Sequence, residues 1–123
     1  MKYIVLGGVA AGTKTAAKLK REDINNEVTI YTKEKEISYA GCGLPYYIGG
    51  AIEERESLVV NTPEKYSSLT GVEVKTEMEA VSVDKDKKVV SFKNGDSVSY
   101  DRLIIATGAS PIVPDIPGIR LKR

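Results

Sequence analysis

The sequence of 123 residues contains no histidine and only one cysteine, Cys42. Without histidine, this chain alone cannot form the common zinc and haem sites or the Ser-His and Cys-His pairs of nucleophilic enzymes. A single cysteine also excludes an internal disulfide. We therefore expect no metal site, and we expect any chemistry to depend on a bound cofactor.

The chain also lacks a strong charge of either sign and any long apolar run. Its 18 Lys and Arg residues against 17 Asp and Glu residues leave a formal charge of +1, which predicts no nucleic-acid partner and no anionic membrane partner. No apolar run approaches the roughly 18 residues of a membrane span, and the first residues do not fit a signal peptide. The sequence thus predicts a cytoplasmic protein with enough residues for one domain.

The first third of the chain has the pattern of a βαβ unit. Residues 3–6 form an apolar run typical of a strand buried on both faces of a parallel sheet. A glycine-containing turn follows at residues 7–12, and the Ala, Lys and Leu residues of 13–21 favour a helix. A second strand is expected at residues 27–32, which gives the spacing of a right-handed crossover.

The glycine turn predicts a phosphate site. Gly7 permits a tight turn, Gly12 allows the helix to pack close to the strand, and amides at the helix start would face a pyrophosphate. Val9 stands where the G-x-G-x-x-G pattern has its second glycine. Thr32, with Glu34 just beyond it, falls where an acidic ribose ligand is expected. A dinucleotide is the expected ligand, although similar turns occur in α/β proteins that bind none.

The rest of the chain predicts a second, antiparallel layer. A helix capped by Thr62 is expected from residue 63 to about residue 69, and a strand over 72–75. Alternating apolar and polar residues, with a hairpin signal at Asn94-Gly95, predict a β-meander with strands at residues 78–84, 88–92 and 97–100. A buried strand at 102–106 ends in a turn at 107–110. The expected fold is α/β, a Rossmann-like FAD/NAD(P)-binding fold with a central parallel sheet and a flanking antiparallel β-meander.

Three segments carry a resemblance to a known family. They are residues 7–12 (GGVAAG), residues 37–47 (ISYAGCGLPYY) and residues 100–108 (YDRLIIATG). Together they resemble the pyridine nucleotide-disulfide oxidoreductase family, in its single-cysteine branch of coenzyme A-disulfide reductases, NADH oxidases and NADH peroxidases. The Ser-x-x-x-Cys-Gly-Leu-Pro-Tyr stretch is the distinctive segment, and the resemblance spans essentially the whole chain.

The resemblance implies a domain plan and two cofactors. Residues 1–110 would be the amino-terminal part of an FAD-binding domain, and the Pro-rich residues 111–123 would lead towards an NAD(P)H domain that this chain lacks. FAD would be the bound cofactor, NAD(P)H the reductant, and the full-length protein a homodimer. The implied cofactor-binding residues are Gly7, Gly8, Val9, Ala10, Ala11 and Gly12 at the pyrophosphate, Thr32 and Lys33 near the ribose, Ala80 near adenine, and Ala106, Thr107, Gly108 and Cys42 elsewhere along the cofactor.

Cys42 would be the catalytic residue. The resemblance implies a redox nucleophile near the flavin, which alternates between a thiolate and either a mixed disulfide with coenzyme A or a sulfenic acid. A helix that starts at Cys42, with Pro45 in its first turn, would favour the thiolate through the helix dipole. The alternative is an inert cysteine in the core.

The choice of substrate depends on Ala10 and on the first helix. Oxidase and peroxidase members have a histidine at the position of Ala10, so alanine favours the coenzyme A-disulfide branch. Lys14, Lys18 and Arg21 share one helix face and could receive coenzyme A phosphates, or form an ordinary solvated face. The resemblance places Ser38 near the pantetheine arm.

The expected function is therefore a coenzyme A-disulfide or related polysulfide reductase. Two alternatives stay open: an NADH oxidase or peroxidase, and a non-catalytic flavin-binding module, because the isolated chain lacks the reductant domain.

Overall fold

The computed structural model, which describes residues 1–122, has a four-stranded parallel sheet at its centre. The strands are β1 (Lys2–Leu6), β2 (Glu27–Tyr31), β3 (Glu73–Lys75) and β7 (Arg102–Ile105). They lie in the order β3-β2-β1-β7, and every neighbouring pair is parallel. The predicted central parallel sheet is confirmed.

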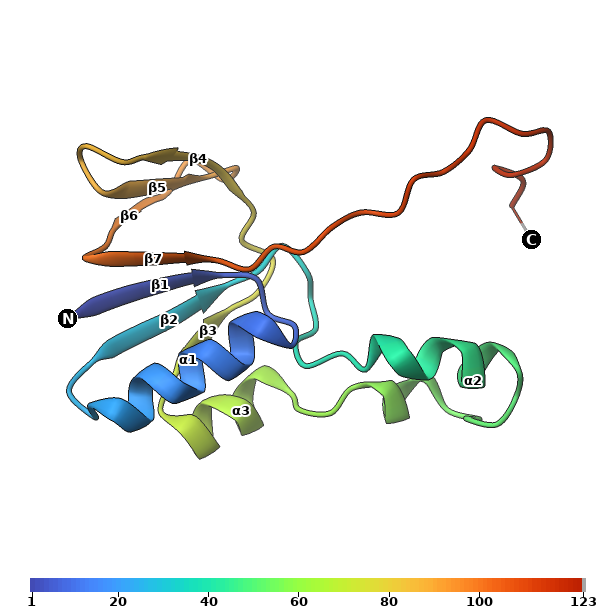
Figure 1. The fold of residues 1–123 in the computed structure, drawn as a ribbon, viewed down its shortest axis with the longest axis horizontal. Coiled ribbons are helices and arrows are strands. Elements are labelled where there is room, and N and C mark those ends of the chain that lie inside the picture. The colour runs from blue at the N-terminus through green and yellow to red at the C-terminus, as the bar shows by residue number, and fades with distance from the viewer. Residues whose placement is uncertain (123) are drawn as a thin grey trace.

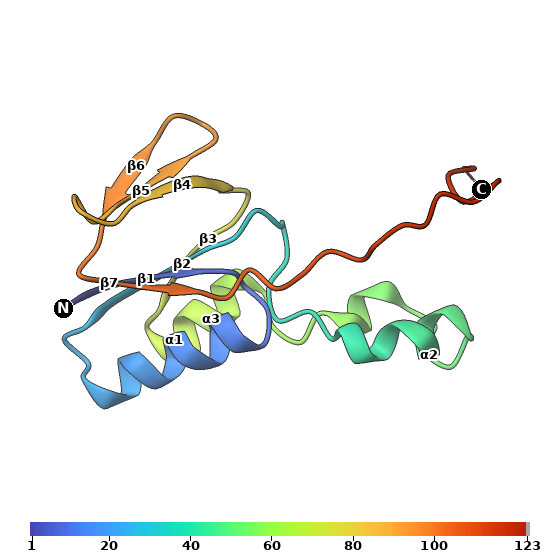
Figure 2. The same cartoon turned by 45° about the horizontal axis from the view of Figure 1, so that its top comes forward.

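Two helices cover one face of this sheet: α1 (Ala11–Glu22) and α3 (Pro63–Thr70) (Figures 1 and 2). The bounds of α3 follow from its sequence, because the Thr62 side chain accepts a hydrogen bond from the Lys65 amide and Gly71 ends the helix in the left-handed conformation. The core between these helices and the sheet consists of Val5, Ala16, Val28, Ile30, Ile37, Tyr66 and Val72.

A smaller antiparallel sheet covers the other face. Its strands are β4 (Ala80–Asp84), β5 (Val89–Phe92) and β6 (Ser97–Ser99), in sequential order, which confirms the predicted meander. Side chains of β1 alternate between the layers: Val5 faces the helices, whereas Ile4 and Leu6 pack with residues of β5. The Tyr31 and Phe92 rings, 4.6 Å apart at their centroids, join the two sheets.

Two predicted boundaries shift in ways that matter for the site. Helix α1 begins at Ala11 rather than at residue 13, so the helix starts inside the glycine turn. Strand β4 begins at Ala80 rather than at residue 78. The chain turns sharply at Glu77, which has φ 56°, and the Met78 amide donates to the Thr32 carbonyl instead of joining the meander.

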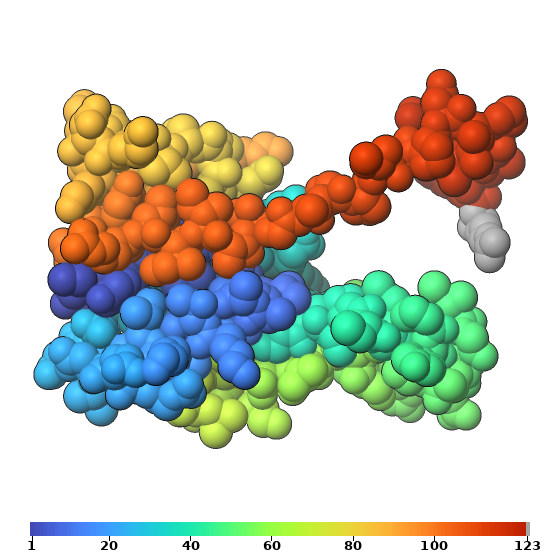
Figure 3. Space-filling view, in the orientation of Figure 1, coloured from blue at the N-terminus to red at the C-terminus, as the bar shows by residue number. Residues whose placement is uncertain are grey.

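Two segments extend beyond the carboxyl ends of the parallel strands (Figures 1 and 3). The first holds the short 3-10 helix η1 (Gly41–Gly43), helix α2 (Leu44–Ile48) and the 3-10 helix η2 (Arg55–Leu58). The second is the segment after β7, which forms no helix or strand from residue 106 to residue 116. Within residues 1–122, no helix combines the length and the apolar character needed to cross a membrane.

Candidate functional site

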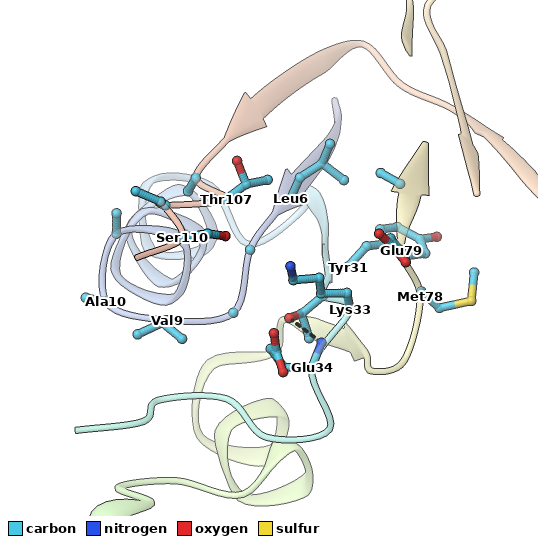
Figure 4. A pocket seen from close by; sticks show the side chains of 18 of the residues that line it. Leu6, Val9, Ala10, Tyr31, Lys33, Glu34, Met78, Glu79, Thr107 and Ser110 are labelled. Atoms are coloured by element: carbon cyan, nitrogen blue, oxygen red, sulfur yellow. Dashed lines mark hydrogen bonds between the residues drawn. The ribbon is translucent and has the colours of Figure 1, made fainter. Parts of the chain in front are cut away.

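A cleft of about 740 Å³ lies at the carboxyl ends of β1, β2 and β7 (Figure 4). Residues 6–11, 31–34, 78–80 and 106–111 line it. Strand β1 lies between β2 and β7. The strands that follow β1 in the sequence, β2 and β3, lie on one side of it, and the last strand, β7, lies on the other, so the strand order reverses at β1. Ligands of open α/β sheets bind at this kind of switch point.

The glycine turn is packed too closely for side chains. A Cβ atom on Gly7 would lie 2.0 Å from the Ala106 carbonyl oxygen, and one on Gly8 would lie 2.7 Å from Cγ2 of Ile37. A Cβ on Gly12 would lie 1.9 Å from the Gly7 carbonyl oxygen. Gly7 also has φ 116°, which favours glycine. Gly7 and Gly8 line the cleft, whereas Gly12 is buried and acts by letting α1 approach the turn.

The amide end of α1 opens on the cleft without a polar cap of its own. Ala10 occupies the N-cap position, no side chain caps the helix, and its first turn has no acidic residue. The last turn, by contrast, carries Lys20 and Arg21, which suit the negative end of the dipole. Ala10 and Ala11 are exposed and line the cleft. Such a helix start is suited to bind an anion.

The end of β2 forms a second wall. Thr32 is 5% exposed, and its hydroxyl oxygen accepts a 3.2 Å hydrogen bond from the Glu34 amide. The side chains of Lys33 and Glu34 are exposed at the cleft (Figure 4). Thr32 therefore contributes a buried wall here, while the exposed charges belong to its two neighbours.

The remaining walls come from the ends of the two sheets. The predicted residues Ala80, Ala106, Thr107 and Gly108 all line the cleft. Sequence reasoning missed Met78 and Glu79, which reach the cleft through the turn at Glu77. No local pattern marks this turn, because the left-handed residue is a glutamate rather than a glycine.

A smaller pocket of about 430 Å³ adjoins the cleft, with Val9 and Glu34 lining both. Arg55 closes one side through two hydrogen bonds to the Glu36 carboxylate, of 3.0 and 3.2 Å. No sequence pattern marks this pair, because the two residues are brought together only by the fold.

Cys42 is exposed in η1, which contradicts the alternative of a core cysteine. It does not line the main cleft, but its segment is attached to the glycine turn. The Ser38 amide donates to the Gly8 carbonyl at 2.9 Å, and the Ala40 amide donates to the Leu58 carbonyl at 2.7 Å. The expected helix does not begin at Cys42: α2 follows η1 and starts at Leu44, with Pro45 in its first turn, and has only five residues.

Lys14, Lys18 and Arg21 are exposed on α1, as their spacing predicts. Lys18 also pairs with Glu22 one turn later, and its hydrogen bond holds the pKa of that carboxyl below its ordinary value. Ser38 lies on a different segment, and within residues 1–122 no hydrogen bond or ion pair joins it to the three cations.

Comparison with known proteins gives one consistent family. The family model described as pyridine nucleotide-disulphide oxidoreductase matches residues 1–123. The chain is 38% identical to an NADH oxidase of Methanocaldococcus jannaschii over 122 residues, which cover 96% of this chain and 27% of that protein. It is 35% identical to a coenzyme A disulfide reductase of Staphylococcus haemolyticus over 113 residues, which cover 88% of this chain and 26% of that protein.

A solved structure agrees with these sequence matches. The crystal structure of reduced CoADR-RHD from Bacillus anthracis superposes with a TM-score of 0.88 and 42% identity, covering 96% of this chain and 22% of that one. The chain thus spans about a quarter of the length of the curated relatives that it matches.

Proposed function

The chain belongs to the pyridine nucleotide-disulphide oxidoreductase family, and from this we propose that it is the FAD-binding part of a coenzyme A-disulfide reductase with Cys42 as its redox nucleophile. The observation that carries the proposal is the cleft at the switch point of the sheet, with the uncapped start of α1 on one side and the cysteine segment attached to its glycine turn. NAD(P)H is the proposed reductant, bound by a domain outside this chain.

The glycine turn supports FAD as the ligand of the cleft. The turn from Gly7 to Ala11 offers main-chain amides and no acidic side chain to a pyrophosphate. Thr32 and Lys33 would lie along the ribose, Ala80 near the adenine, and residues 106–108 along the remaining edge. When bound, FAD would supply the electron transfer from NAD(P)H to the disulfide at Cys42, which the side chains of this chain cannot carry out.

Cys42 is exposed and so is accessible to a disulfide. Its thiolate would attack one sulfur of coenzyme A disulfide, so that a Cys42–coenzyme A disulfide forms, the substrate disulfide breaks, and one coenzyme A leaves as a thiolate that takes up a proton. Two electrons and one proton from NAD(P)H would then break the mixed disulfide, release the second coenzyme A as a thiol and restore the Cys42 thiolate.

Two features support coenzyme A as the substrate. The exposed cations Lys14, Lys18 and Arg21 match the negative charges of its phosphates. Ala10, at the start of α1, leaves no imidazole there for reaction with peroxide or oxygen. Ser38 would lie beside the pantetheine arm. For the full-length protein, the proposal is a cytoplasmic homodimer with no nucleic-acid or membrane partner.

An NADH oxidase or peroxidase is the second candidate, because one relative at 38% identity carries the name NADH oxidase. In that case peroxide would oxidise Cys42 to a sulfenic acid. A non-catalytic flavin-binding module, the third alternative, would give neither product.

The 123-residue chain can separate these candidates without a reductant. Mixed with coenzyme A disulfide, it should gain the mass of one coenzyme A, and Cys42→Ser should gain none. Hydrogen peroxide followed by dimedone tests for the sulfenic acid. Peroxide oxidation that is much faster than coenzyme A transfer would contradict the proposal in favour of the oxidase.

The cationic face has its own test. Lys18→Gln with Arg21→Gln should slow the transfer from coenzyme A disulfide but not from hydroxyethyl disulfide, which has no charge. The matched control, Lys85→Gln with Lys87→Gln, removes two exposed lysines from the turn between β4 and β5. Equal effects of the two double variants on the rate would show that only net charge matters, and would refute a binding role for α1.

A further inference from the structure

Helix α3 is joined to the first turn of α1 by a buried hydrogen bond. Tyr66 of α3 is 6% exposed, and its hydroxyl donates to the main-chain carbonyl of Thr13. Burial raises the pKa of Tyr66 above its ordinary value of 10.0, which favours the protonated hydroxyl that donates this bond. The contact joins residues 53 positions apart in the sequence.

A second hydrogen bond extends this connection to the cleft. The Thr13 hydroxyl donates to the Ala10 carbonyl at 3.2 Å, and Thr13 itself is only 9% exposed. Ala10 lines the cleft at the start of α1. A continuous path of two side chains thus leads from α3 to the turn that borders the cleft.

The turn has main-chain hydrogen bonds of its own, but it carries a strained residue and no side-chain cap. Ala10 has φ 22°, outside the conformations that alanine prefers, and no side chain caps α1. A backbone in such a conformation persists only where its surroundings hold it. Tyr66 can supply this support because its own helix is fixed at both ends, by the Thr62 cap and by Gly71.

We propose that Tyr66, acting through Thr13, is a positioning residue for the nucleotide site, where it holds the first turn of α1 in the conformation that receives the pyrophosphate. The inference rests on the proposed function, and it goes further by assigning a role in cofactor binding to a residue that does not line the cleft.

The test compares FAD binding to the 123-residue chain and to Tyr66→Phe, which keeps the ring and removes only the hydroxyl. Loss of one buried hydrogen bond should weaken FAD binding about three- to tenfold, measured by quenching of flavin fluorescence. In the cofactor-free protein, the amide NMR signals of Ala10 and Ala11 should shift. Thr13→Ala should behave like Tyr66→Phe, whereas Thr13→Ser, which keeps the hydroxyl, should bind FAD like the wild type.

Val28→Ala is the matched control for simple loss of stability. Val28 is buried in the same core but pairs with Tyr3 at the end of β2 far from the cleft. Val28→Ala should lower the unfolding temperature without changing the FAD affinity or the amide NMR signals of Ala10 and Ala11. Equal FAD affinity in Tyr66→Phe and wild type, or an equal loss in Val28→Ala, would overturn the inference. Failure of the wild type itself to bind FAD would instead refute the nucleotide site.

Discussion

Replacing Ala11 by aspartate should separate the stability of the fold from cofactor binding, because the two respond in opposite directions. Ala11 is the exposed first residue of α1, it lines the cleft, and the first turn of α1 has no acidic residue. A carboxylate at this position interacts favourably with the helix dipole, by about 0.3–1 kcal/mol. The same carboxylate would repel the pyrophosphate proposed to bind there.

The size of the repulsion follows from Coulomb's law. A carboxylate about 6 Å from each of two phosphate charges, at an effective dielectric constant of about 40 for an exposed site, costs about 1.4 kcal/mol for each charge. Screening at physiological salt, with a Debye length of about 8 Å, reduces the sum to about 1.3 kcal/mol. Ala11→Asp should therefore weaken FAD binding about tenfold.

The assay is a titration of FAD followed by quenching of its fluorescence, with thermal unfolding of the cofactor-free chain measured in parallel. Ala11→Asn has nearly the same shape without the charge, and should bind FAD much more tightly than Ala11→Asp. The difference in FAD affinity between the two variants should become smaller as salt is added. If Ala11→Asp binds FAD as tightly as Ala11→Asn at low salt, the start of α1 does not hold the pyrophosphate.

Two further predictions concern stability. Gly12→Ala should lower the free energy of unfolding, measured in urea, by about 3 kcal/mol or more, because its Cβ would lie 1.9 Å from a main-chain oxygen. The control Gly41→Ala, which has open space around it, should be tolerated. Similar losses in the two variants would contradict the close packing at Gly12. The free energy of unfolding should fall as pH rises above about 10. Burial raises the pKa values of Tyr31 and Tyr66 in the folded state, so the unfolded chain loses protons first, and urea unfolding at about pH 9 and about pH 11 measures the difference. Tyr66→Phe should reduce this loss.

The features predicted well from sequence are those whose cause is local. The apolar run of β1, the glycine turn and the Ala-rich helix gave the βαβ unit with small errors at the boundaries. Asn94-Gly95 likewise predicted the hairpin between β5 and β6, where Gly95 has φ 94°. In each case the backbone requirement falls on residues adjacent in the sequence.

The features that sequence reasoning missed depend on contacts between distant segments. Met78 and Glu79 reach the cleft because the Met78 amide pairs with Thr32. Tyr66 has the sequence pattern of any buried tyrosine, and its bond to Thr13 exists only once α3 packs on α1. Local periodicity indicates which face of a helix or strand is buried, but not which polar atoms form hydrogen bonds with one another.

Cys42 illustrates both what local sequence predicts and what depends on tertiary contacts. The sequence predicted a helix that begins at the thiol, but α2 begins at Leu44 and has only five residues, so its dipole is a weak source of thiolate stabilisation. The stronger constraint is one that the sequence did not reveal: Ile37 fills the space against Gly8, and the Ser38 amide donates to the Gly8 carbonyl, four residues before the thiol. Because Gly8 also lines the cleft, the segment that carries Cys42 is attached directly to the turn proposed to hold the cofactor. The location of the thiol therefore depends on tertiary contacts of the glycine turn, and less on the short helix that follows it.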